Sequence, residues 1–151
     1  MAYKQDEKGR FIKVAVITWT VDPEGTMRFL MRHNKPFNGY DDEWTVTFGN
    51  IELDETIESG ARREVEEEFG IKDFSDKALN LNYEIEYEGK HGKTVIYFFA
   101  IQVPNIDTKV ALNEESIGYD WMKIDDAKKV MQHEDERKAF DVLTSKIEKK
   151  S

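Results

Sequence analysis

Residues 49–71 read GNIELDETIESGARREVEEEFGI, and this acidic stretch is the most informative part of the chain. Gly70 stands where a helix commonly ends in a left-handed residue. Before it, apolar residues recur every fourth position, which is the spacing of one face of an α-helix: Ile57, Ala61, Val65 and Phe69. The pattern therefore predicts an amphipathic helix over residues 56–69 whose apolar stripe packs on a core.

Three glutamates of this helix, Glu64, Glu67 and Glu68, stand three and four residues apart, so their carboxylates share one face. Two full charges about 5 Å apart repel by roughly 3 kcal/mol at an effective dielectric of about 20. Three unscreened carboxylates would raise their pKa values or weaken the helix, and a bound divalent cation removes that cost. All-oxygen ligands favour Mg²⁺ or Mn²⁺ over zinc. The alternative is an ordinary helix with a solvated acidic face.

The stretch fits the pattern Gly, five residues, Glu, seven residues, Arg-Glu-Val-x-Glu-Glu-x-Gly-Ile at every position. This pattern is the Nudix box, and the chain resembles the Nudix hydrolases, which cleave a diphosphate bond in nucleoside diphosphates linked to another group. The resemblance implies that Glu64, Glu67 and Glu68 bind Mg²⁺ or Mn²⁺ as cofactor. It also implies that the backbone carbonyl of Gly49 joins the metal sphere, and a glycine permits this close approach.

Two further box residues, Glu55 and Arg63, match positions that hold the catalytic loop and helix in place in the resembled family. The box also contains Glu58 and Glu66, which we expect to face water. The three histidines of the chain show no metal-ligand spacing and receive no role: His33, His91 and His133.

Outside the box, the resembled family often carries a general base or a further metal ligand on an acidic loop. Asn113-Glu114-Glu115 precedes Trp121 in the way that the family often shows. Glu115 is therefore a catalytic candidate beside Glu64 and Glu67, with Glu114 as the alternative. An exposed loop carboxylate without a role remains the competing interpretation of Glu115.

Length and composition limit the possible functions. The chain has 151 residues, which predicts one domain over residues 1–151. A net charge of -9 argues against duplex nucleic acid as a partner, whereas a small nucleotide is compatible if bound cations supply positive charge. Cysteine is absent, which excludes disulfides and thiolate nucleophiles. No signal peptide or membrane span is recognisable, so we expect no membrane partner and a cytoplasmic location.

β-Rich runs at residues 11–20 and 27–31 flank an Asp-Pro-Glu-Gly turn and predict a hairpin. The other expected elements are a polar loop at 33–43, a short apolar approach to the box at 44–48, strands at 81–87 and 93–103 joined by a turn at 89–92, short strands at 110–113 and 121–122, and helices at 125–131 and 136–149. Strands interspersed with three helices indicate the α/β class, with a mixed sheet covered by helices. The resemblance refines this to the Nudix fold, an α/β/α sandwich with a central mixed β-sheet.

A weaker resemblance covers the C-terminal half. GKTVIYFFAIQV at residues 92–103 and NEESIGYDWMKIDDAKKV at 113–130 look like the asymmetrical diadenosine tetraphosphate hydrolases. In that subgroup, water attacks a phosphate of the dinucleotide and releases ATP and AMP, while Lys and Tyr residues contact phosphate and adenine. The counterparts that the resemblance implies for substrate binding are Lys93, Tyr87 and Tyr119.

These aromatic residues also have a packing interpretation. Tyr87 can equally be a cross-strand packing residue, and Tyr97, Phe98 and Phe99 are expected in the strand core rather than on a base-stacking surface. Aromatic residues alone do not define a purine site.

The chain departs from the subgroup just before Gly49. The subgroup usually carries Pro-Lys there, whereas this chain has Thr47-Phe48, and many relatives have Gly in place of Asp54. A missing phosphate contact costs on the order of 1 to 3 kcal/mol, which weakens the case for a dinucleoside polyphosphate.

Three functions follow from these observations. The first is a Mg²⁺-dependent pyrophosphohydrolase acting on a nucleotide, with a dinucleoside tetraphosphate as the favoured substrate. The second is hydrolysis of nucleoside triphosphates to monophosphates. The third is a nucleotide sensor that binds without cleaving, against which the complete box argues. The resemblance also leaves a homodimer open.

Overall fold

The computed structural model describes residues 3–34 and 43–150. Strands within these ranges form one mixed sheet of seven: β1 (Phe11–Val21), β2 (Met27–Asn34), β3 (Glu43–Thr45), β4 (Thr47–Asn50), β5 (Leu79–Gly89), β6 (Gly92–Gln102) and β7 (Ser116–Met122). The sheet order is β3-β2-β1-β6-β5, with β4 paired to β1 and β7 paired to β2. β1 and β6 run parallel, and the other pairs are antiparallel.

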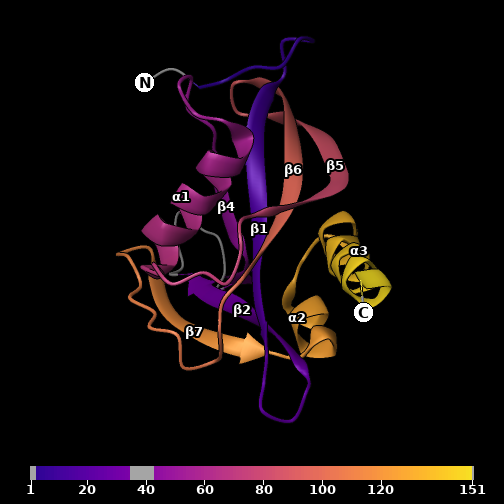
Figure 1. Ribbon diagram of the computed structural model, residues 1–151. Coiled ribbons are helices and arrows are strands. Elements are labelled where there is room, and N and C mark those ends of the chain that lie inside the picture. Colours follow the sequence, from indigo (N-terminus) through magenta and orange to yellow (C-terminus); the bar gives the residue numbers. More distant parts are fainter. Residues whose placement is uncertain (1–2, 35–42, 151) are drawn as a thin grey trace.

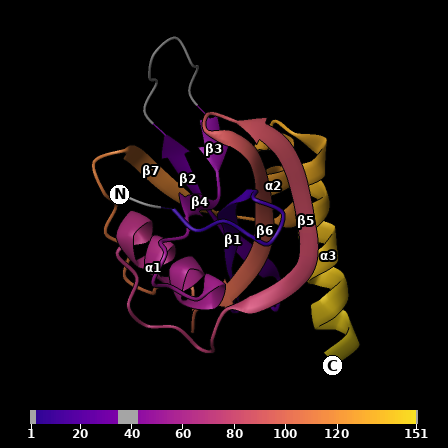
Figure 2. The same ribbon diagram turned by 90° about the horizontal axis from the view of Figure 1, so that it is seen from above.

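Helices cover both faces of this sheet. α1 (Ile57–Phe69) lies on one face, and α2 (Ile124–Val130) and α3 (Glu134–Lys150) lie on the other (Figures 1 and 2). Strand side chains alternate between the faces and form two separate hydrophobic clusters, one under α1 and one under α2 and α3. The predicted α/β class and its mixed sheet between helices are confirmed.

Local sequence explains where α1 begins and ends. The Thr56 hydroxyl accepts a hydrogen bond from the Ser59 backbone N–H at 3.1 Å, and the Ser59 hydroxyl accepts one from the Thr56 N–H at 3.1 Å. This reciprocal capping box satisfies two of the free N–H groups at the helix start. At the other end, Gly70 adopts a φ of 63°, as predicted. Most of the predicted apolar stripe is fully buried: Ala61, Val65 and Phe69.

Replacing Thr56 with Ala should lower the free energy of unfolding by about 1 kcal/mol, because the Ser59 N–H loses its capping acceptor. Urea denaturation monitored by circular dichroism measures this loss. Thr56→Ser keeps the hydroxyl oxygen and serves as the matched control, which should remain within a few tenths of a kcal/mol of the unchanged protein. Equal stability of the Ala and Ser variants would contradict a capping role.

The Asp-Pro-Glu-Gly hairpin and the 89–92 turn are confirmed, but the loop prediction that starts at residue 33 is wrong at both of its described ends. β2 continues to Asn34 because both of its edges are paired there, with β3 on one side and β7 on the other. The His33 ring stacks on Trp44 with centroids 4.6 Å apart. The predicted approach to the box at 44–48 instead contributes to two strands, β3 and β4. The remainder of the predicted loop, residues 35–42, lies outside the described residues.

Residues 110–113 do not form the predicted strand. Their backbone hydrogen-bonds instead to the end of α1, with Ala111 N–H donating to the Phe69 carbonyl at 2.7 Å. By contrast, β7 is longer than the predicted pair Trp121-Met122, because pairing with β2 extends it back to Ser116. The two C-terminal helices begin one and two residues before their predicted starts. Within the described residues, none of the helices combines the length and apolar character needed to cross a membrane.

Candidate active site

The carboxylates of α1 lie against β4, the strand that leads into the helix. Gly49 of β4 pairs with Val14 of β1, and a side chain at Gly49 would overlap the carboxyl group of Glu64. The missing Cβ therefore makes the space that Glu64 occupies beside the strand backbone. This contact explains why position 49 requires glycine although its φ is not in the left-handed region.

Arg63 holds the loop between β4 and α1. Its guanidinium binds both carboxylate oxygens of Glu55, and its Nη2 donates to the Asn50 carbonyl at 3.1 Å. Such fork-shaped pairing fixes direction as well as distance. The hydrogen bond with Arg63 is the main cause that lowers the pKa of Glu55. Glu55 is further anchored because its carboxylate accepts the Glu52 N–H at 3.0 Å and its carbonyl accepts Lys4 Nζ at 2.8 Å.

The same guanidinium also contacts two of the predicted metal ligands. Arg63 Nη1 lies 3.0 Å from Glu64 Oε1 and 3.1 Å from Glu67 Oε2. Glu64 is mostly buried, and burial raises its pKa to about 6, against the opposing charge of Arg63. Glu67 is more open, with 57% of its side chain exposed. Arg63 thus links the loop to the carboxylate face.

Glu68 is buried near the end of α1, where its Oε1 lies 2.8 Å from Arg32 Nη2 of β2. Burial raises the pKa of Glu68 to about 8, and the Arg32 charge only partly opposes this shift. Thr47 of β4 also favours the ionised carboxylate, but its hydroxyl and Glu68 Oε2 do not reach hydrogen-bond geometry with any described residue. One oxygen of a buried carboxylate therefore has an unused acceptor position.

In the absence of divalent cations, the free energy of unfolding should fall as pH rises from 4.5 to about 8. An unfolded glutamate loses its proton near 4.5, whereas the folded protein keeps the Glu64 proton to about 6 and the Glu68 proton to about 8. Folding thus takes up protons in this window, so rising pH opposes it. Urea titrations in EDTA across this range measure the slope.

Glu68→Gln should remove the part of this slope that lies above pH 6, because the amide cannot titrate. Glu136 on α3 provides a control, since burial raises its pKa in the same direction away from this site. Glu136→Gln should therefore leave the slope above pH 6 in place. A Glu68→Gln protein with the unchanged pH slope would show that Glu68 titrates normally in the folded state.

The donor set on α1 suits a divalent cation, although the side chains are not yet gathered around one point. Among the described residues, no three His, Asp or Glu side chains stand close enough together to hold a metal ion. Glu67 is instead directed to Arg63, and Glu68 to Arg32. Carboxylate oxygens, the unpartnered Glu68 Oε2 and the close approach of the Glu64 carboxyl group to the Gly49 backbone fit Mg²⁺ or Mn²⁺.

Glu115 directly precedes β7 and has a side chain that is 75% exposed. Its Oε2 lies 4.0 Å from Arg32 Nη1, so the structure brings Glu115 to the guanidinium that also binds Glu68. Glu114 is exposed. Proximity to Arg32 thus favours Glu115 over Glu114, and its role stays a prediction.

The three predicted substrate contacts are not gathered at one place. Lys93 and Tyr87 lie on the β5–β6 hairpin, where Lys93 pairs with Glu88 and Tyr87 pairs with Thr94. Neighbouring positions of a strand face opposite ways, so Lys93 and Tyr87 point to opposite faces. Tyr119 lies across the sheet, on β7. A role in substrate binding stays a prediction for all three.

Sequence reasoning missed Arg32, which contacts the carboxylate site from another strand. The signal was present, because Arg32 follows the apolar run 27–31 and a continued strand would place it in the sheet. Ending the strand at Met31 assigned Arg32 to no element. Thr47 was noted as a departure from the subgroup, but its burial beside Glu68 was not foreseen.

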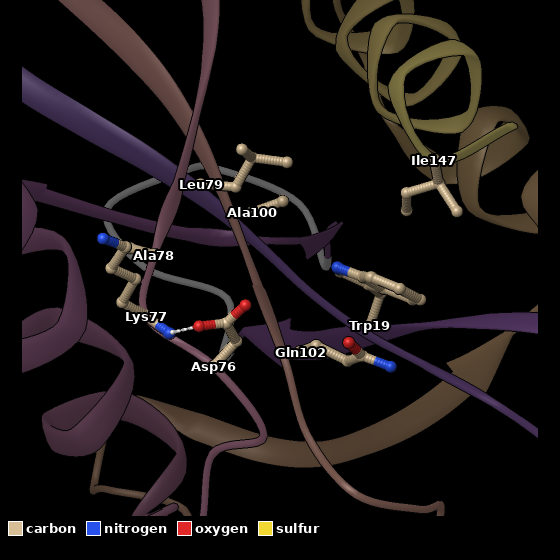
Figure 3. Close-up of a pocket in the computed structure, with 8 residues that line it drawn as sticks. All are labelled: Trp19, Asp76, Lys77, Ala78, Leu79, Ala100, Gln102 and Ile147. Carbon is tan, nitrogen blue, oxygen red and sulfur yellow. Dashed lines mark hydrogen bonds between the residues drawn. The ribbon is translucent and has the colours of Figure 1, made fainter. Parts of the chain in front are cut away.

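A pocket with a volume of about 290 Å³ lies on the face covered by α3, away from these carboxylates (Figure 3). Its floor is formed by β1 and β6, and Ile147 of α3 closes one side (Figure 3). The lining consists of Trp19, Asp76, Lys77, Ala78, Leu79, Ala100, Gln102 and Ile147. None of the α1 carboxylates lines it, so the pocket is not part of the candidate active site.

The mixed sheet lies between helices, and the acidic helix α1 lies beside β4. The protein is therefore of the α/β/α class and carries a carboxylate site on α1. Residues 12–143 match the NUDIX domain, and the chain belongs to the NUDIX family. Members of this family are pyrophosphohydrolases that act on phosphoric anhydride bonds of small nucleotide substrates and generally need divalent metal ions.

Two curated relatives from Rattus norvegicus are similar to this chain. The asymmetrical bis(5'-nucleosyl)-tetraphosphatase is 33% identical over 94 residues, which cover 61% of this chain and 63% of that protein. Diphosphoinositol polyphosphate phosphohydrolase 2 is 32% identical over 95 residues, which cover 62% of this chain and 50% of that protein. The match therefore spans less than two thirds of the length of either relative.

Solved structures show the same fold. A NUDIX hydrolase from Listeria monocytogenes superimposes with a TM-score of 0.78 and 20% identity, over 92% of this chain and 95% of that one. The Ap4A hydrolase of C. elegans, in a binary complex, gives a TM-score of 0.74 and 17% identity, over 91% of this chain and 97% of that one. At these identities the likeness establishes the fold alone.

Proposed function

We propose that this chain is a Mg²⁺-dependent pyrophosphohydrolase that cleaves a phosphoric anhydride bond in a nucleotide, with bis(5'-nucleosyl)-tetraphosphate as the favoured substrate. The observation that carries the proposal is the carboxylate face of α1. Glu64 is seated on the Gly49 backbone, and Glu68 keeps a buried oxygen without a partner. Burial favours protons on these two carboxyl groups, and a bound divalent cation would take the place of those protons.

The residues that would hold Mg²⁺ are Glu64, Glu67 and Glu68, together with the Gly49 carbonyl. When bound, Mg²⁺ offsets phosphate charge and makes a coordinated water more acidic. Arg63 and Glu55 keep the loop and helix in register through their fork-shaped pair. In this proposal Glu115 takes the proton from the attacking water, because its exposed carboxylate can approach a phosphate bound at α1.

The water attacks phosphorus, the anhydride oxygen leaves with the departing phosphate, and the water proton passes to Glu115. For a dinucleoside tetraphosphate of adenosine the products are ATP and AMP. Fold analogy alone does not settle the substrate. Support for a dinucleotide comes from the rat tetraphosphatase. Its 33% sequence identity to this chain is higher than the identity of the solved structures that share the fold.

Among the described residues, the positive charge near the carboxylates favours a nucleotide over a densely phosphorylated inositol. Phe48 occupies the position where the subgroup usually has a lysine and packs on the core under α2 and α3. Arg32 and Arg63 lie beside the carboxylates but already pair with Glu68 and Glu55. A densely phosphorylated inositol would need further cations here, since each phosphate charge must be offset. We therefore rank diphosphoinositol substrates below nucleotides.

Product analysis tests this proposal. The protein is incubated with Mg²⁺ and, separately, with diadenosine tetraphosphate, nucleoside triphosphates, ADP-ribose, nucleotide sugars and a diphosphoinositol polyphosphate, and the products are resolved by anion-exchange chromatography. ATP plus AMP from the dinucleotide supports the favoured substrate. Monophosphate plus pyrophosphate from a triphosphate supports the second function that the sequence suggested. Binding by calorimetry without turnover of any compound would contradict an enzyme and support a sensor.

A further inference from the structure

Arg32 is a buried cation that contacts two separate segments of the candidate site. The residue is 7% exposed and lies in the middle of β2 pairing, opposite Thr45 of β3 and Tyr119 of β7. A charged side chain is rarely buried unless it is paired, so its partners are informative. They come from α1 and from the start of β7.

The two ends of the guanidinium fork bind these segments separately. Nη2 lies 2.8 Å from Glu68 Oε1 on α1. Nη1 donates to Ser116 Oγ at 3.3 Å and lies 4.0 Å from Glu115 Oε2. Arg32 therefore stands between a predicted metal ligand and the predicted general base.

Backbone hydrogen bonds fix the preceding loop to the same end of α1. Ala111 N–H donates to the Phe69 carbonyl at 2.7 Å, and Asn113 N–H donates more weakly to the Glu68 carbonyl at 3.4 Å. Asn113 continues this connection, because its carbonyl accepts the Ser116 N–H at 3.4 Å and its Oδ1 accepts the Glu115 N–H at 3.2 Å. The Arg32 side chain adds a direct contact between Glu68 and the segment 115–116. This segment is otherwise exposed at Glu115.

We propose that Arg32 is a positioning residue that sets Glu115 relative to the carboxylate face of α1 by binding Glu68 and Ser116 at the same time. The inference rests on the proposed hydrolase function and assigns Arg32 to that site. A planar guanidinium can hold two partners in fixed directions, whereas the ammonium of lysine is a single point charge. Geometry, and not charge alone, is therefore the property that Arg32 contributes.

The variants Arg32→Lys and Arg32→Gln separate geometry from charge. We expect Arg32→Lys to lower kcat by about 10- to 100-fold with little change in KM, because small misplacement of a reacting group is costly. Arg28→Gln is the matched control, since Arg28 lies on the same strand but pairs with Asp22 at 2.8 Å, outside the site. This control should keep its kcat.

Coupling to Glu115 is measured with Glu115→Gln alone and combined with Arg32→Lys. If Arg32 acts through Glu115, the kcat of the double variant should stay within about threefold of the kcat of the slower single variant. A loss of kcat in the double variant equal to the product of the two single-variant losses would overturn the inference. Full kcat in Arg32→Lys or in Glu115→Gln would overturn it as well.

Hydrogen exchange supplies a readout that does not depend on turnover. Amides of residues 111–118 should exchange faster in Arg32→Lys and Arg32→Gln, but not in Arg28→Gln, while amides of β1 and β6 keep their protection. Unchanged exchange at 111–118 would overturn the inference. If the unchanged protein hydrolyses no compound of the panel, the proposed function is contradicted separately, and the exchange pattern alone decides whether Arg32 positions this segment.

Discussion

Glu67→Gln should lower kcat by about 100-fold or more on any substrate that the protein cleaves. Glu67 is the most open of the three predicted metal ligands on α1, with 57% of its side chain exposed, so its replacement should not disturb folding. The amide is a weaker ligand for Mg²⁺, and losing about 3 kcal/mol of transition-state stabilisation corresponds to this factor. Steady-state kinetics with saturating Mg²⁺ measure the effect.

The neighbouring Glu66 provides the matched control. It lies on the same helix, also carries an exposed carboxylate and pairs with Arg62 at 3.2 Å, away from the site. Glu66→Gln should therefore retain kcat within about twofold, since surface ion pairs contribute little. Full turnover by Glu67→Gln on every substrate would remove Glu67 from the proposed ligand set.

Gly49→Ala should lower the activity by about 100-fold while leaving the protein folded. The added methyl group would overlap the Glu64 carboxyl group, so Glu64 must leave its place beside β4. Displacement of one reacting or ligating group by about 1 Å is enough for a loss of this size. Kinetics and Mn²⁺ binding by electron paramagnetic resonance measure it, because weaker Mn²⁺ binding is expected if Glu64 is a ligand.

Gly118→Ala tests whether the effect is specific to the site. Gly118 also lies in a strand, and among the described residues an added Cβ would meet His33 Cβ at an ordinary distance of 3.9 Å and nothing closer. Its activity and Mn²⁺ affinity should match those of the unchanged protein. Equal activity of Gly49→Ala and the unchanged protein would show that Glu64 is not held where the structure places it.

The parts of the fold with local signals were predictable from the sequence. The four-residue spacing of the apolar stripe and Gly70 predicted α1, and the turn residues at 22–25 and 89–92 predicted two hairpins. Periodicity could not predict where strands end, because partners distant in the chain determine this. Arg32–Asn34 became strand through pairing on both edges, whereas residues 110–113 bonded to α1 instead.

The candidate site divides in the same way. The residues of one continuous motif could be proposed from the sequence, and the structure adds that two of them, Arg63 and Glu55, pair with each other. Arg32 and Thr47 could not be assigned to the site from the sequence, because their importance depends on which strands meet at the end of α1. Lys93, Tyr87 and Tyr119 were assigned by resemblance, and the sheet order places Tyr119 on β7, across the sheet from the hairpin that carries the other two.

The most direct test of the account is the dependence of hydrolysis on Mg²⁺. Diadenosine tetraphosphate is supplied to metal-stripped protein, Mg²⁺ is titrated, and ATP and AMP are measured, with Glu66→Gln and Glu67→Gln in parallel. We expect no turnover in EDTA, a saturable rise in turnover with Mg²⁺ for the unchanged protein and Glu66→Gln, and a strongly reduced rise for Glu67→Gln. Full turnover in EDTA, or the same Mg²⁺ dependence in all three proteins, would contradict this expectation.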